Sequence, residues 1–481
     1  MADSLIRIIN LWILFPIGLF FRLILIFSVL LIIRRLYVYG KKRSKVAVVV
    51  LGDVGRSPRM SYHSVSLASH GFDVTLVGYA GSVPHPLVLE SKKIRLQFVK
   101  EAHVTRGYLP IFTKLELKIY TSCVSALLYK SHITATYNTT YLLLQNPPCI
   151  PSLAICCFLS VCNGSKLIID WHNYGYSILA LSLGENHLMV KVAKCQKVRI
   201  VSKRAYLMYE EIFGQLSSGN LCVTKAMQEH LFNKWNISAD VMHDRAASIF
   251  RKLDNEERHK LFLRFGEDYP EFATPGKGES RFTHMGELGV SMKSDRPAIL
   301  ISSTSWTEDE DFSVLLEALQ YYEENTSLDL PNILCVITGK GPQKSYYQKQ
   351  IAAKNWKRVE IITPWLEASD YPKLLGSADL GVSLHTSSSG LDLPMKVVDM
   401  FGSSLPVAAI NFNCLSELVQ HNVNGFVFEN SAELSKQLVN IFSDFPQDRT
   451  TLNRLSKEVE KFRNITWNEA WDKNVLPLFK R

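Results

Sequence analysis

Short, continuous runs of apolar and β-branched residues recur along most of this chain and constrain its fold more than any other feature. Each run is of strand length, and stretches of helical character separate them. Strands that are apolar on both faces and alternate with helices are typical of a parallel sheet covered on both sides. The first half contains such runs at Val46–Leu51, Val74–Val77, Tyr141–Leu144, Leu167–Ile169, Arg199–Ser202 and Leu221–Thr224.

The second half repeats this alternation. Its predicted strands are Ala298–Ser302, Ile333–Thr338, Val359–Ile362, Leu380–Leu384 and Val407–Ala409, and its predicted helices are Phe312–Tyr322, Tyr371–Gly376, Lys396–Phe401 and a region from Ser431 onward. A chain of 481 residues is too long for one ordinary core. The sequence therefore predicts an α/β protein with two doubly wound, Rossmann-like domains. In such domains ligands bind beyond the carboxyl ends of the strands, which predicts a cleft between the two.

The expected domain boundaries follow from this alternation. Residues 46–245 form the first domain and residues 297–445 the second, while 446–481 form a C-terminal helical region that packs back on the first domain. Residues 246–296 are charged and lack periodicity, and they include the stretch FGEDYPEFATPGKGES. Proline, glycine and acidic residues in this combination are typical of a linker or surface insertion.

The N-terminal segment, residues 1–45, is predicted to anchor the chain in a membrane. Leu11–Ile33 are 23 residues with the single charge of Arg22, and as a helix they would span about 34 Å, enough for a hydrocarbon layer of about 30 Å. A cleaved signal peptide is the alternative, but this run is longer than such peptides use, and Arg34 and Arg35 follow it instead of a cleavage site. Six Lys or Arg residues flank its C-terminal end, so the positive-inside rule places the body of the protein in the cytosol.

The charge distribution argues against a nucleic-acid-binding protein, and the cysteine pattern argues against a structural metal site. The net charge is +9, but residues 1–45 contribute eight Lys or Arg and one acid, or +7, so that the remainder carries only +2. A nearly neutral body does not indicate a nucleic-acid-binding protein. The nine cysteines are odd in number and lack metal-ligand spacing, which indicates a reducing compartment and no structural metal.

The loop after the first strand is a candidate anion-binding site. In VVVLGDVGRSPRM, Ser57 occupies a helix N-cap position and Pro58 the first helical position, and the helix is expected to run to about Ser69 and to stop at Gly71. Free N–H groups at a helix start attract phosphate. The candidate ligands in this loop are Gly52, Gly55, Arg56 and Arg59. The alternative is that the arginines only pair with surface acids or lipid headgroups.

Three loops of the second half could contribute donors to a bound phosphate or base. Ser303 and Thr304 follow one strand, Gly339 and Gly341 form a turn after the next, and the backbone near Leu366 follows a third. The Asp-x-Asp at residues 309–311 could be taken for a metal site. Because Thr307 and Glu310 have capping-box spacing, we assign these acids to a helix start and expect no protein-bound metal.

A fourth loop and its helix combine a glycine, a cation and an acid. Gly390 lies in a Ser/Gly loop, and Lys396 and Asp399 lie three residues apart on one helix face. A lysine with loop N–H groups suits a diphosphate, and a carboxylate one turn later suits ribose hydroxyls. The alternative is a surface ion pair of little energetic value.

The run GLDLPMKVVDMFGSSLPV resembles the nucleotide-sugar loop and helix of GT-B glycosyltransferases at Pro394, Lys396, Asp399, Gly402 and Pro406.

A narrower resemblance, to the chitobiosyldiphosphodolichol β-mannosyltransferase family, rests on six blocks in one order. These are LGDVGRSPRMSYHSVSLASHGFDVTLVGY, LLLQNPPCIP, IIDWHNYGYSIL, LCVTKAM, ISSTSWTEDEDF and GLDLPMKVVDMFG. The chain departs from general GT-B patterns where the first acid of an E-x7-E pair falls on Leu391, beside Asp392. It also lacks the usual Arg and Lys near residues 303–312.

The resemblance implies transfer of mannose from GDP-mannose to the chitobiose of a dolichyl diphosphate at the endoplasmic reticulum membrane, with inversion to a β1,4 link. It implies no tightly bound cofactor, any divalent cation acting only as a stimulant, and other mannosyltransferases of the pathway as partners. The diphosphate of the acceptor would bind Arg56 and Arg59. Asp53 is the first candidate for the general base and His172, in IIDWHNYG with Asp170, the second.

Two alternative functions, and two interpretations of one apolar segment, remain open at the level of sequence. The chain could be a retaining GT-B hexosyltransferase with another acceptor, or a non-catalytic membrane subunit that scaffolds other enzymes. The apolar stretch Cys149–Cys162 is too short to span a membrane. It is either a buried core helix or a surface that dips into the membrane to admit dolichol.

Overall fold

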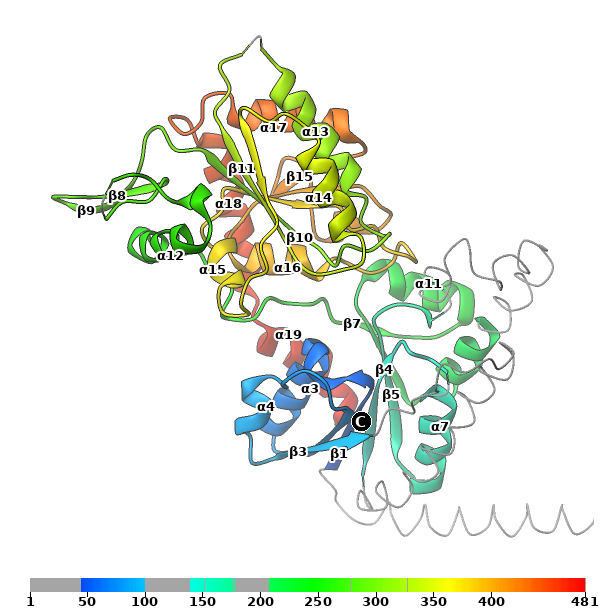
Figure 1. Ribbon diagram of the computed structural model, residues 1–481. Coiled ribbons are helices and arrows are strands. Elements are labelled where there is room, and N and C mark those ends of the chain that lie inside the picture. Colours follow the sequence, from blue (N-terminus) through cyan, green and yellow to red (C-terminus); the bar gives the residue numbers. More distant parts are fainter. Residues whose placement is uncertain are drawn as a thin grey trace, which may run out of the picture. The chain divides into compact units, whose positions relative to one another are not determined.

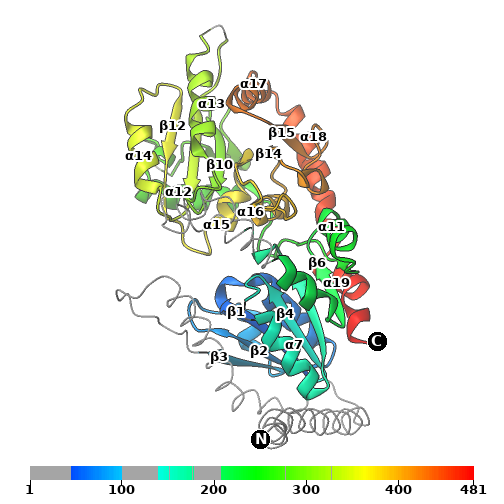
Figure 2. The same cartoon turned by 90° about the vertical axis from the view of Figure 1, so that its right-hand side faces the viewer.

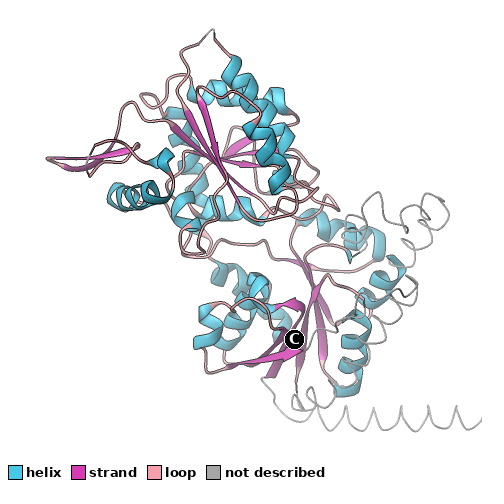
Figure 3. Cartoon of the chain, viewed as in Figure 1, coloured by secondary structure: helices cyan, strands magenta, loops and turns pink. Residues whose placement is uncertain are grey.

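The computed structural model describes residues 45–99, 139–150, 152–175, 177, 207–276, 278–326 and 328–480, and these form two compact units (Figure 1). The first unit contains the chain up to Cys222, His230–Asp240 and the residues from Val475 on, and the second contains Val223–Glu229 and Val241–Asn474. Each unit has a central sheet with helices packed against it (Figure 3). The predicted strand Arg199–Ser202 lies outside the described residues.

The sheet of the first unit has the strand order β3-β2-β1-β4-β5-β6-β7. Val46 of β1 pairs in parallel with Val74 of β2 on one side and with Tyr141 of β4 on the other, so the strand order reverses between β1 and β4. The elements are β1 (Lys45–Asp53), α3 (Pro58–Ser69), β2 (Asp73–Tyr79), α4 (Pro86–Glu90), β3 (Ile94–Val99), β4 (Tyr141–Asn146), α7 (Ser152–Asn163), β5 (Lys166–Trp171), β6 (Gly219–Cys222), α11 (Lys225–Trp235) and β7 (Asp240–Val241).

The predicted strands of the first unit that fall on described residues are confirmed, most of them extended by one or two residues. The last strand ends two residues before the predicted Thr224. β3 was not predicted because Arg95 and Gln97 interrupt its apolar residues, a pattern that suits an edge strand with one exposed face.

Helix α3 begins and ends as predicted. Pro58 is its first residue, and Gly71 after its end has a φ of +92°, the left-handed conformation that glycine adopts at low cost. Ser57 occupies the N-cap position, but its side chain makes no capping hydrogen bond. Its hydroxyl instead donates to Oε1 of Gln145 on β4, at 2.5 Å. The side chain therefore joins the segment that follows β1 to β4, at the point where the strand order reverses.

The second sheet has the order β12-β11-β10-β13-β14-β15, and its paired strands are parallel. Ala298 and Leu300 belong to the core on one face, with α13 and α17, whereas Ile299 and Ile301 belong to the core on the other face, with α12 and α16. Burial of both faces explains the continuous apolar runs. The elements are β10 (Ala298–Ser303), α13 (Phe312–Glu324), β11 (Ile333–Thr338), α14 (Lys344–Ala352), β12 (Val359–Ile362), α15 (Tyr371–Leu375), β13 (Leu380–Ser383), α16 (Met395–Gly402), β14 (Val407–Ile410), β15 (Gly425–Phe428) and α17 (Ser431–Phe442).

Residues 246–296, expected to be a linker or insertion, contain a helix that packs into the core of the second unit. Helix α12 (Asn255–Asp268) begins at a capping box formed by Asp254 and Glu257. Phe262 and Phe265 are buried in the same core as Ile299 of β10. This helix was not predicted from the sequence because many residues of its exposed face are charged. Strands β8 (Thr283–Gly286) and β9 (Gly289–Met292) form a hairpin that projects beside it (Figure 1).

The C-terminal region is helical, as expected, and its parts belong to different units. Helix α18 (Thr450–Glu460) contacts α16 and, with α19 (Trp467–Asn474), belongs to the second unit. The residues from Val475 on belong to the first unit, where the Tyr141 hydroxyl donates to the Phe479 carbonyl at 2.7 Å. The C-terminus accordingly lies beside the first sheet in both views (Figures 1 and 2).

The predicted membrane anchor, Leu11–Ile33, lies outside the described residues. Within the part of the chain that the structure describes, no helix combines the length and the apolar character needed to cross a bilayer.

We predict that Phe262→Ala destabilises the second unit by about 3–5 kcal/mol, because it removes a fully buried ring from α12 and leaves a cavity. Leu288→Ala in the hairpin turn is the control, since Leu288 is fully exposed and its loss should change the free energy of unfolding by less than about 0.5 kcal/mol. Urea unfolding of the two variants checks this. Equal stability of both would show that α12 is dispensable.

Candidate active site

The strand order of the second sheet reverses between β10 and β13, and polar residues gather beyond the carboxyl ends of these strands. Glu310, on the loop after β10, is 2% exposed. Its Oε2 accepts hydrogen bonds from the Thr304 hydroxyl at 2.8 Å and from the Ser305 N–H at 3.0 Å. Its Oε1 accepts from the Lys396 ammonium of α16. A buried carboxylate therefore fixes the loop after β10 and ties it to the start of α16.

The assignment of Glu310 to a capping box with Thr307 is wrong. Helix α13 begins after Asp311, whose carboxylate accepts from the Ser313 N–H at 2.9 Å. Glu310 was predicted to cap because spacing alone cannot distinguish a side chain that turns back to its own helix from one that pairs with a distant lysine.

Helix α16 carries Lys396 and Asp399, and these two residues do not pair with each other. Lys396 pairs with Glu310, and its side chain remains 25% exposed. The partly buried Asp399 carboxylate accepts no hydrogen bond from any described residue. Burial, reinforced by the charge of Asp244, raises the pKa of Asp399 to about 8. A carboxyl group with unused acceptor capacity beside a lysine suits a polyhydroxylated ligand.

His385 follows β13 and lies between two acids. Its Nδ1 is 3.5 Å from Asp309 Oδ2, and its Nε2 is 3.9 Å from Asp392 Oδ2. Burial opposes its charge, but the nearby carboxylates of Asp309 and Asp392 raise the pKa of His385 to about 9. The hydrogen bond with His385 in turn lowers the pKa of Asp309. His385 is therefore a second cation near Lys396, and sequence reasoning missed this role because it depends on acids from two other loops.

The glycine turn after β11 packs against the loop after β10. A Cβ atom at Gly339 would lie 1.8 Å from the Thr304 carbonyl oxygen, and one at Gly341 would lie 1.7 Å from the Ser305 oxygen. Only glycine fits at either position. These residues therefore shape the loop and expose its backbone, whether or not they touch a ligand.

The remaining predicted residues of this site already have structural roles. The Ser303 hydroxyl is 2.9 Å from the Tyr371 hydroxyl, and Leu366 is buried in the core. Gly390 has a φ of +73°, which favours glycine in this loop.

A flat aromatic surface beside these loops was not predicted. Trp365 is half exposed, and the Lys340 ammonium lies 3.8 Å from the centroid of its ring. An exposed indole can stack on a nucleobase.

In the first unit, Asp53 is saturated with hydrogen bonds. It accepts from the Gly55 N–H at 3.0 Å and from the N–H and hydroxyl of Ser82, each at 2.8 Å. Burial acts to raise its pKa, but the hydrogen bonds from Ser82 and Gly55 lower the pKa of Asp53 overall. A Cβ atom at Gly55 would lie 2.4 Å from the Ser82 carbonyl oxygen, whereas Gly52 has no such close neighbour. Asp53 thus organises the loop and is a weak base.

Asp170 is fully buried at the end of β5, and its carboxylate contacts the side chains of three residues, two of which were predicted for the site. It accepts from Arg59 Nε at 2.8 Å and Nη2 at 3.0 Å, and it lies 3.1 Å from His63 Nε2 and 2.8 Å from His172 Nε2. Burial acts to raise its pKa, but Arg59 and His172 hold the pKa of Asp170 well below its usual range. Asp170 therefore stays ionised in the interior.

The two arginines of the first loop differ in exposure. The Arg59 side chain is 5% exposed and is bound to Asp170, whereas the Arg56 side chain is 81% exposed. His172 is 23% exposed, and its Nδ1 makes no hydrogen bond with any described residue. The buried His63 was missed because the sequence places it on α3, where a lone histidine carries no signal of its partner on β5.

We predict that Asp399 makes the stability of the second unit depend on pH. Because its folded pKa of about 8 exceeds its unfolded value of 3.8, the native state holds more protons than the unfolded chain between these limits. The free energy of unfolding should therefore fall as the pH rises. Asp399→Asn should melt at a higher temperature than the unsubstituted protein at pH 8.5, by about 2–4 °C per kcal/mol, and at the same temperature near pH 4. If the difference in melting temperature between Asp399→Asn and the unsubstituted protein were the same at pH 4 and pH 8.5, the raised pKa of Asp399 would be contradicted.

Comparison with known proteins places the chain in a family. The model of "Glycosyl transferases group 1" matches residues 289–462. The chain is 47% identical to the chitobiosyldiphosphodolichol β-mannosyltransferase of Homo sapiens over 449 residues, which cover 91% of this chain and 93% of that protein. It is 37% identical to the protein of the same name from Dictyostelium discoideum over 480 residues (91% and 94%). It is also 39% identical to the UDP-glycosyltransferase TURAN of Arabidopsis thaliana over 465 residues (91% and 97%).

Solved structures establish the fold. Sucrose-phosphate synthase of Thermosynechococcus elongatus superposes with a TM-score of 0.62 at 12% identity, covering 91% of this chain and 98% of its own. A glycosyltransferase of Rickettsia africae superposes with a TM-score of 0.56 at 15% identity, covering 92% and 99%. The predicted GT-B fold with two Rossmann-like domains is thus confirmed. The chain is a glycosyltransferase and belongs to the chitobiosyldiphosphodolichol β-mannosyltransferase family.

Proposed function

We propose that this protein transfers mannose from GDP-mannose to the terminal N-acetylglucosamine of dolichyl diphosphate chitobiose, forming a β1,4 link with inversion. The observation that carries the proposal is the 47% identity, over 91% of the chain, to a relative named for this acceptor and product. The polar cluster around Lys396 and the Asp170–His172 pair supply the chemistry that such a transfer requires.

The second unit is proposed to bind the nucleotide sugar. Lys396 and His385 are cations close to the start of α16, where a diphosphate would also meet helix N–H groups. Asp399, one turn later, would accept hydrogen bonds from the ribose hydroxyls. Trp365 would stack on the base. Two cations and backbone dipoles compensate for the arginine and lysine that other GT-B sequences carry near residues 303–312, and they stabilise the charge that develops on the departing nucleoside diphosphate.

His172 is the better supported candidate for the general base, although Asp53 was the first choice from sequence. Inversion requires one in-line displacement in which a base takes the proton of the acceptor hydroxyl. Because Asp170 stays ionised, it accepts the Nε2–H of His172 and leaves Nδ1 with a lone pair for that proton. Asp170 also stabilises the imidazolium that forms. Asp53 cannot serve equally well, since its oxygens are already occupied and its pKa is lowered.

Arg56 and Arg59 have different proposed roles. The Arg56 side chain is 81% exposed, with its Nε 3.5 Å from Asp53 Oδ2 and donating to the Ser82 hydroxyl at 3.3 Å, and it remains a candidate for the acceptor diphosphate. The Arg59 side chain is 5% exposed and donates from Nε and Nη2 to Asp170, so we assign it to positioning the base and not to direct contact with a substrate phosphate.

The exposed face of α7 supports an interaction with lipid. The helix, SLAICCFLSVCN, buries Leu153, Cys156 and Cys157 in the first unit, while Phe158 and Val161 are 55% and 56% exposed. A helix that is apolar on both faces yet exposed on one suits a partner that is itself apolar. We propose that this face meets the endoplasmic reticulum membrane, with the anchor at Leu11–Ile33 holding the body on the cytosolic side.

The deciding experiment incubates the purified full-length protein with a short-chain lipid diphosphate chitobiose and either GDP-mannose or UDP-sugars. The proposal would be supported if the protein used GDP-mannose but not UDP-sugars as the donor, and if the product carried a β-linked mannose. Turnover with UDP-sugars would favour the activity in the name of the Arabidopsis relative. An α-linked product would indicate a retaining enzyme, and a protein that binds neither donor nor acceptor would indicate a scaffold.

We predict that His172→Gln lowers kcat by about 10²- to 10⁴-fold, the usual contribution of a placed general base, and changes the KM for the donor little. His70→Gln is the control, because His70 is an exposed histidine at the end of α3. Steady-state kinetics on both variants test this. If His172→Gln retained more than a tenth of kcat, Asp53 or another group would have to be the base.

We predict that Phe158→Asp raises the KM for a long-chain lipid acceptor and leaves the KM for a short-chain, water-soluble acceptor unchanged, because a charge on this face opposes contact with lipid. Met285→Asp, at an equally exposed apolar position of β8, serves as the control. Equal effects on both acceptors would show that α7 does not meet the lipid.

A further inference from the structure

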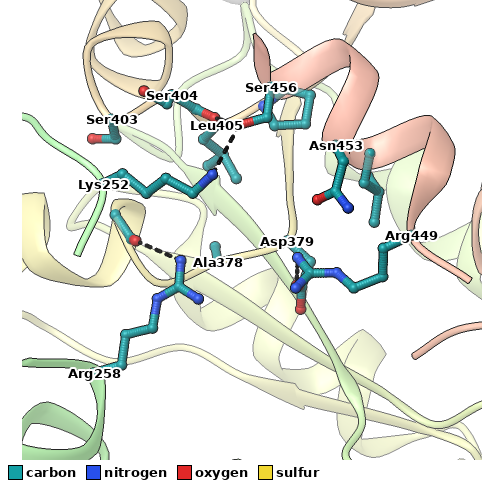
Figure 4. Close-up of a pocket in the computed structure, with 13 residues that line it drawn as sticks. Lys252, Arg258, Ala378, Asp379, Ser403, Ser404, Leu405, Arg449, Asn453 and Ser456 are labelled. Carbon is teal, nitrogen blue, oxygen red and sulfur yellow. Dashed lines mark hydrogen bonds and ion pairs between the residues drawn. The ribbon is translucent and has the colours of Figure 1, made fainter. Parts of the chain in front are cut away.

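A second polar pocket lies in the second unit near the amino ends of β13 and β14, away from the carboxyl-end loops that form the candidate donor site. Figure 4 shows Lys252 and Arg258 on one side of this pocket, Asp379 at its base and Arg449 of the α18 region on the other side. Ser404, after the end of α16, and Ser456 of α18 complete the part of its lining that matters here.

The single buried carboxylate of this pocket is already fully used. Asp379 accepts from Arg296 Nη1 at 2.7 Å and Nη2 at 2.8 Å, and from Arg449 Nη2 at 2.9 Å. The backbone N–H of Ile299 donates to the same group at 2.9 Å. Burial opposes its charge, but Arg296 and Arg449 lower the pKa of Asp379 to about 2. Asp379 therefore has no capacity left for another cation.

Among the described residues, Arg258 and Lys252 have no carboxylate partner of this kind, and Arg449 uses only part of its guanidinium for Asp379. Arg258 is 8% exposed, and it donates from Nη2 to the Gly376 carbonyl at 3.3 Å while its buried Nε–H has no acceptor. The Nε–H of Arg449 is also buried without an acceptor. The Lys252 ammonium reaches the Ser456 hydroxyl at 3.4 Å and Glu460 only at 4.0 Å, in a pair that is about half exposed. Burial lowers the pKa of Lys252, Arg258 and Arg449 alike, as expected for cations that outnumber their counter-ions.

The positively charged side chains around this pocket outnumber the buried acids, so a bound anion would offset the excess charge. Four cations (Lys252, Arg258, Arg296 and Arg449) surround one buried acid, and a buried charge without a partner is costly. Guanidinium N–H groups in a fixed plane match the oxygens of a phosphate, and an ammonium on a flexible stem can close over it. The Ser456 and Ser404 side of the pocket adds polar groups and no acid.

We propose that this pocket is a binding site for a phosphate-type anion, separate from the nucleotide-sugar site. Its enclosed part holds only about 20 Å³, so one oxygen of the anion enters toward Arg258 and Arg449 while the rest stays at the mouth beside Lys252. A ligand with one terminal phosphate fits this arrangement. Free inorganic phosphate and the phosphomonoester headgroup of a lipid share that chemistry.

The test uses the full-length protein in detergent and chloride-free buffer, saturated with GDP so that the donor site is occupied. Isothermal titration with inorganic phosphate, and separately with dihexanoyl phosphatidate, should show saturable binding of at least one. Tighter binding of the phosphatidate would identify a lipid headgroup as the source, and equal or tighter binding of inorganic phosphate would identify the free anion.

Lys252→Gln should weaken this binding about tenfold, the usual effect of losing one charge-assisted hydrogen bond. Lys457→Gln, on α18 but outside the pocket, should leave it unchanged, and so should Lys396→Met in the donor site. The melting temperature of Lys252→Gln without ligand controls for folding. The proposal would be overturned if neither ligand binds, or if Lys252→Gln and the unsubstituted protein bind with equal affinity. GDP binding by the unsubstituted protein and by Lys396→Met is titrated in parallel, so failure of the proposed donor site would be seen independently of this pocket.

Discussion

The parallel alignment of strands in each sheet is the constraint on which both candidate sites depend. All parallel strands present their carboxyl ends at one edge, and where the order reverses, the two adjacent connections leave toward opposite faces. In the second sheet this reversal lies between β10 and β13, and the loops that follow these strands supply Glu310 and His385. In the first sheet it lies between β1 and β4, where the Ser57 hydroxyl meets Gln145. Geometry of the sheet, more than any one motif, brings these polar residues together.

Much of the fold could be predicted from sequence because burial on both faces of a sheet leaves a direct record in the chain. Val46–Leu51 and Ile333–Thr338 are continuous apolar runs for that reason, and Pro58 and Gly71 mark the ends of α3 through local backbone chemistry. Helix α12 escaped prediction because only one of its faces is buried, so the charged residues of its other face dominated the composition. Edge strand β3 escaped for the same reason.

The site was predicted less completely, since partners across the fold leave no local pattern. Lys396 and Asp399 could be chosen because one helix carries both. Nothing in the sequence near Arg59 indicates that it would pair with the buried Asp170, 111 positions away. Nothing near Glu310 indicates that it would pair with Lys396 instead of capping the helix that follows it. The same long-range pairing turned Asp53 from a candidate base into a loop organiser and made His172 the stronger candidate.

The pairing of Lys396 with the buried Glu310 would have a consequence for turnover in the proposed reaction. A lysine that pointed alone at a diphosphate would bind the departing nucleotide strongly and release it slowly, whereas Glu310 shares the charge of Lys396 and fixes the ammonium in place before the substrate arrives. Fixing the side chain in advance reduces the entropy lost on binding, and sharing its charge limits the affinity for the product. Asp170 is proposed to act on His172 in a comparable way, because it fixes the orientation of the ring and stabilises the positive charge that forms when the ring takes the proton of the acceptor. In each unit the buried acid would therefore act through a more exposed partner. Glu310 would act through Lys396, and Asp170 through His172.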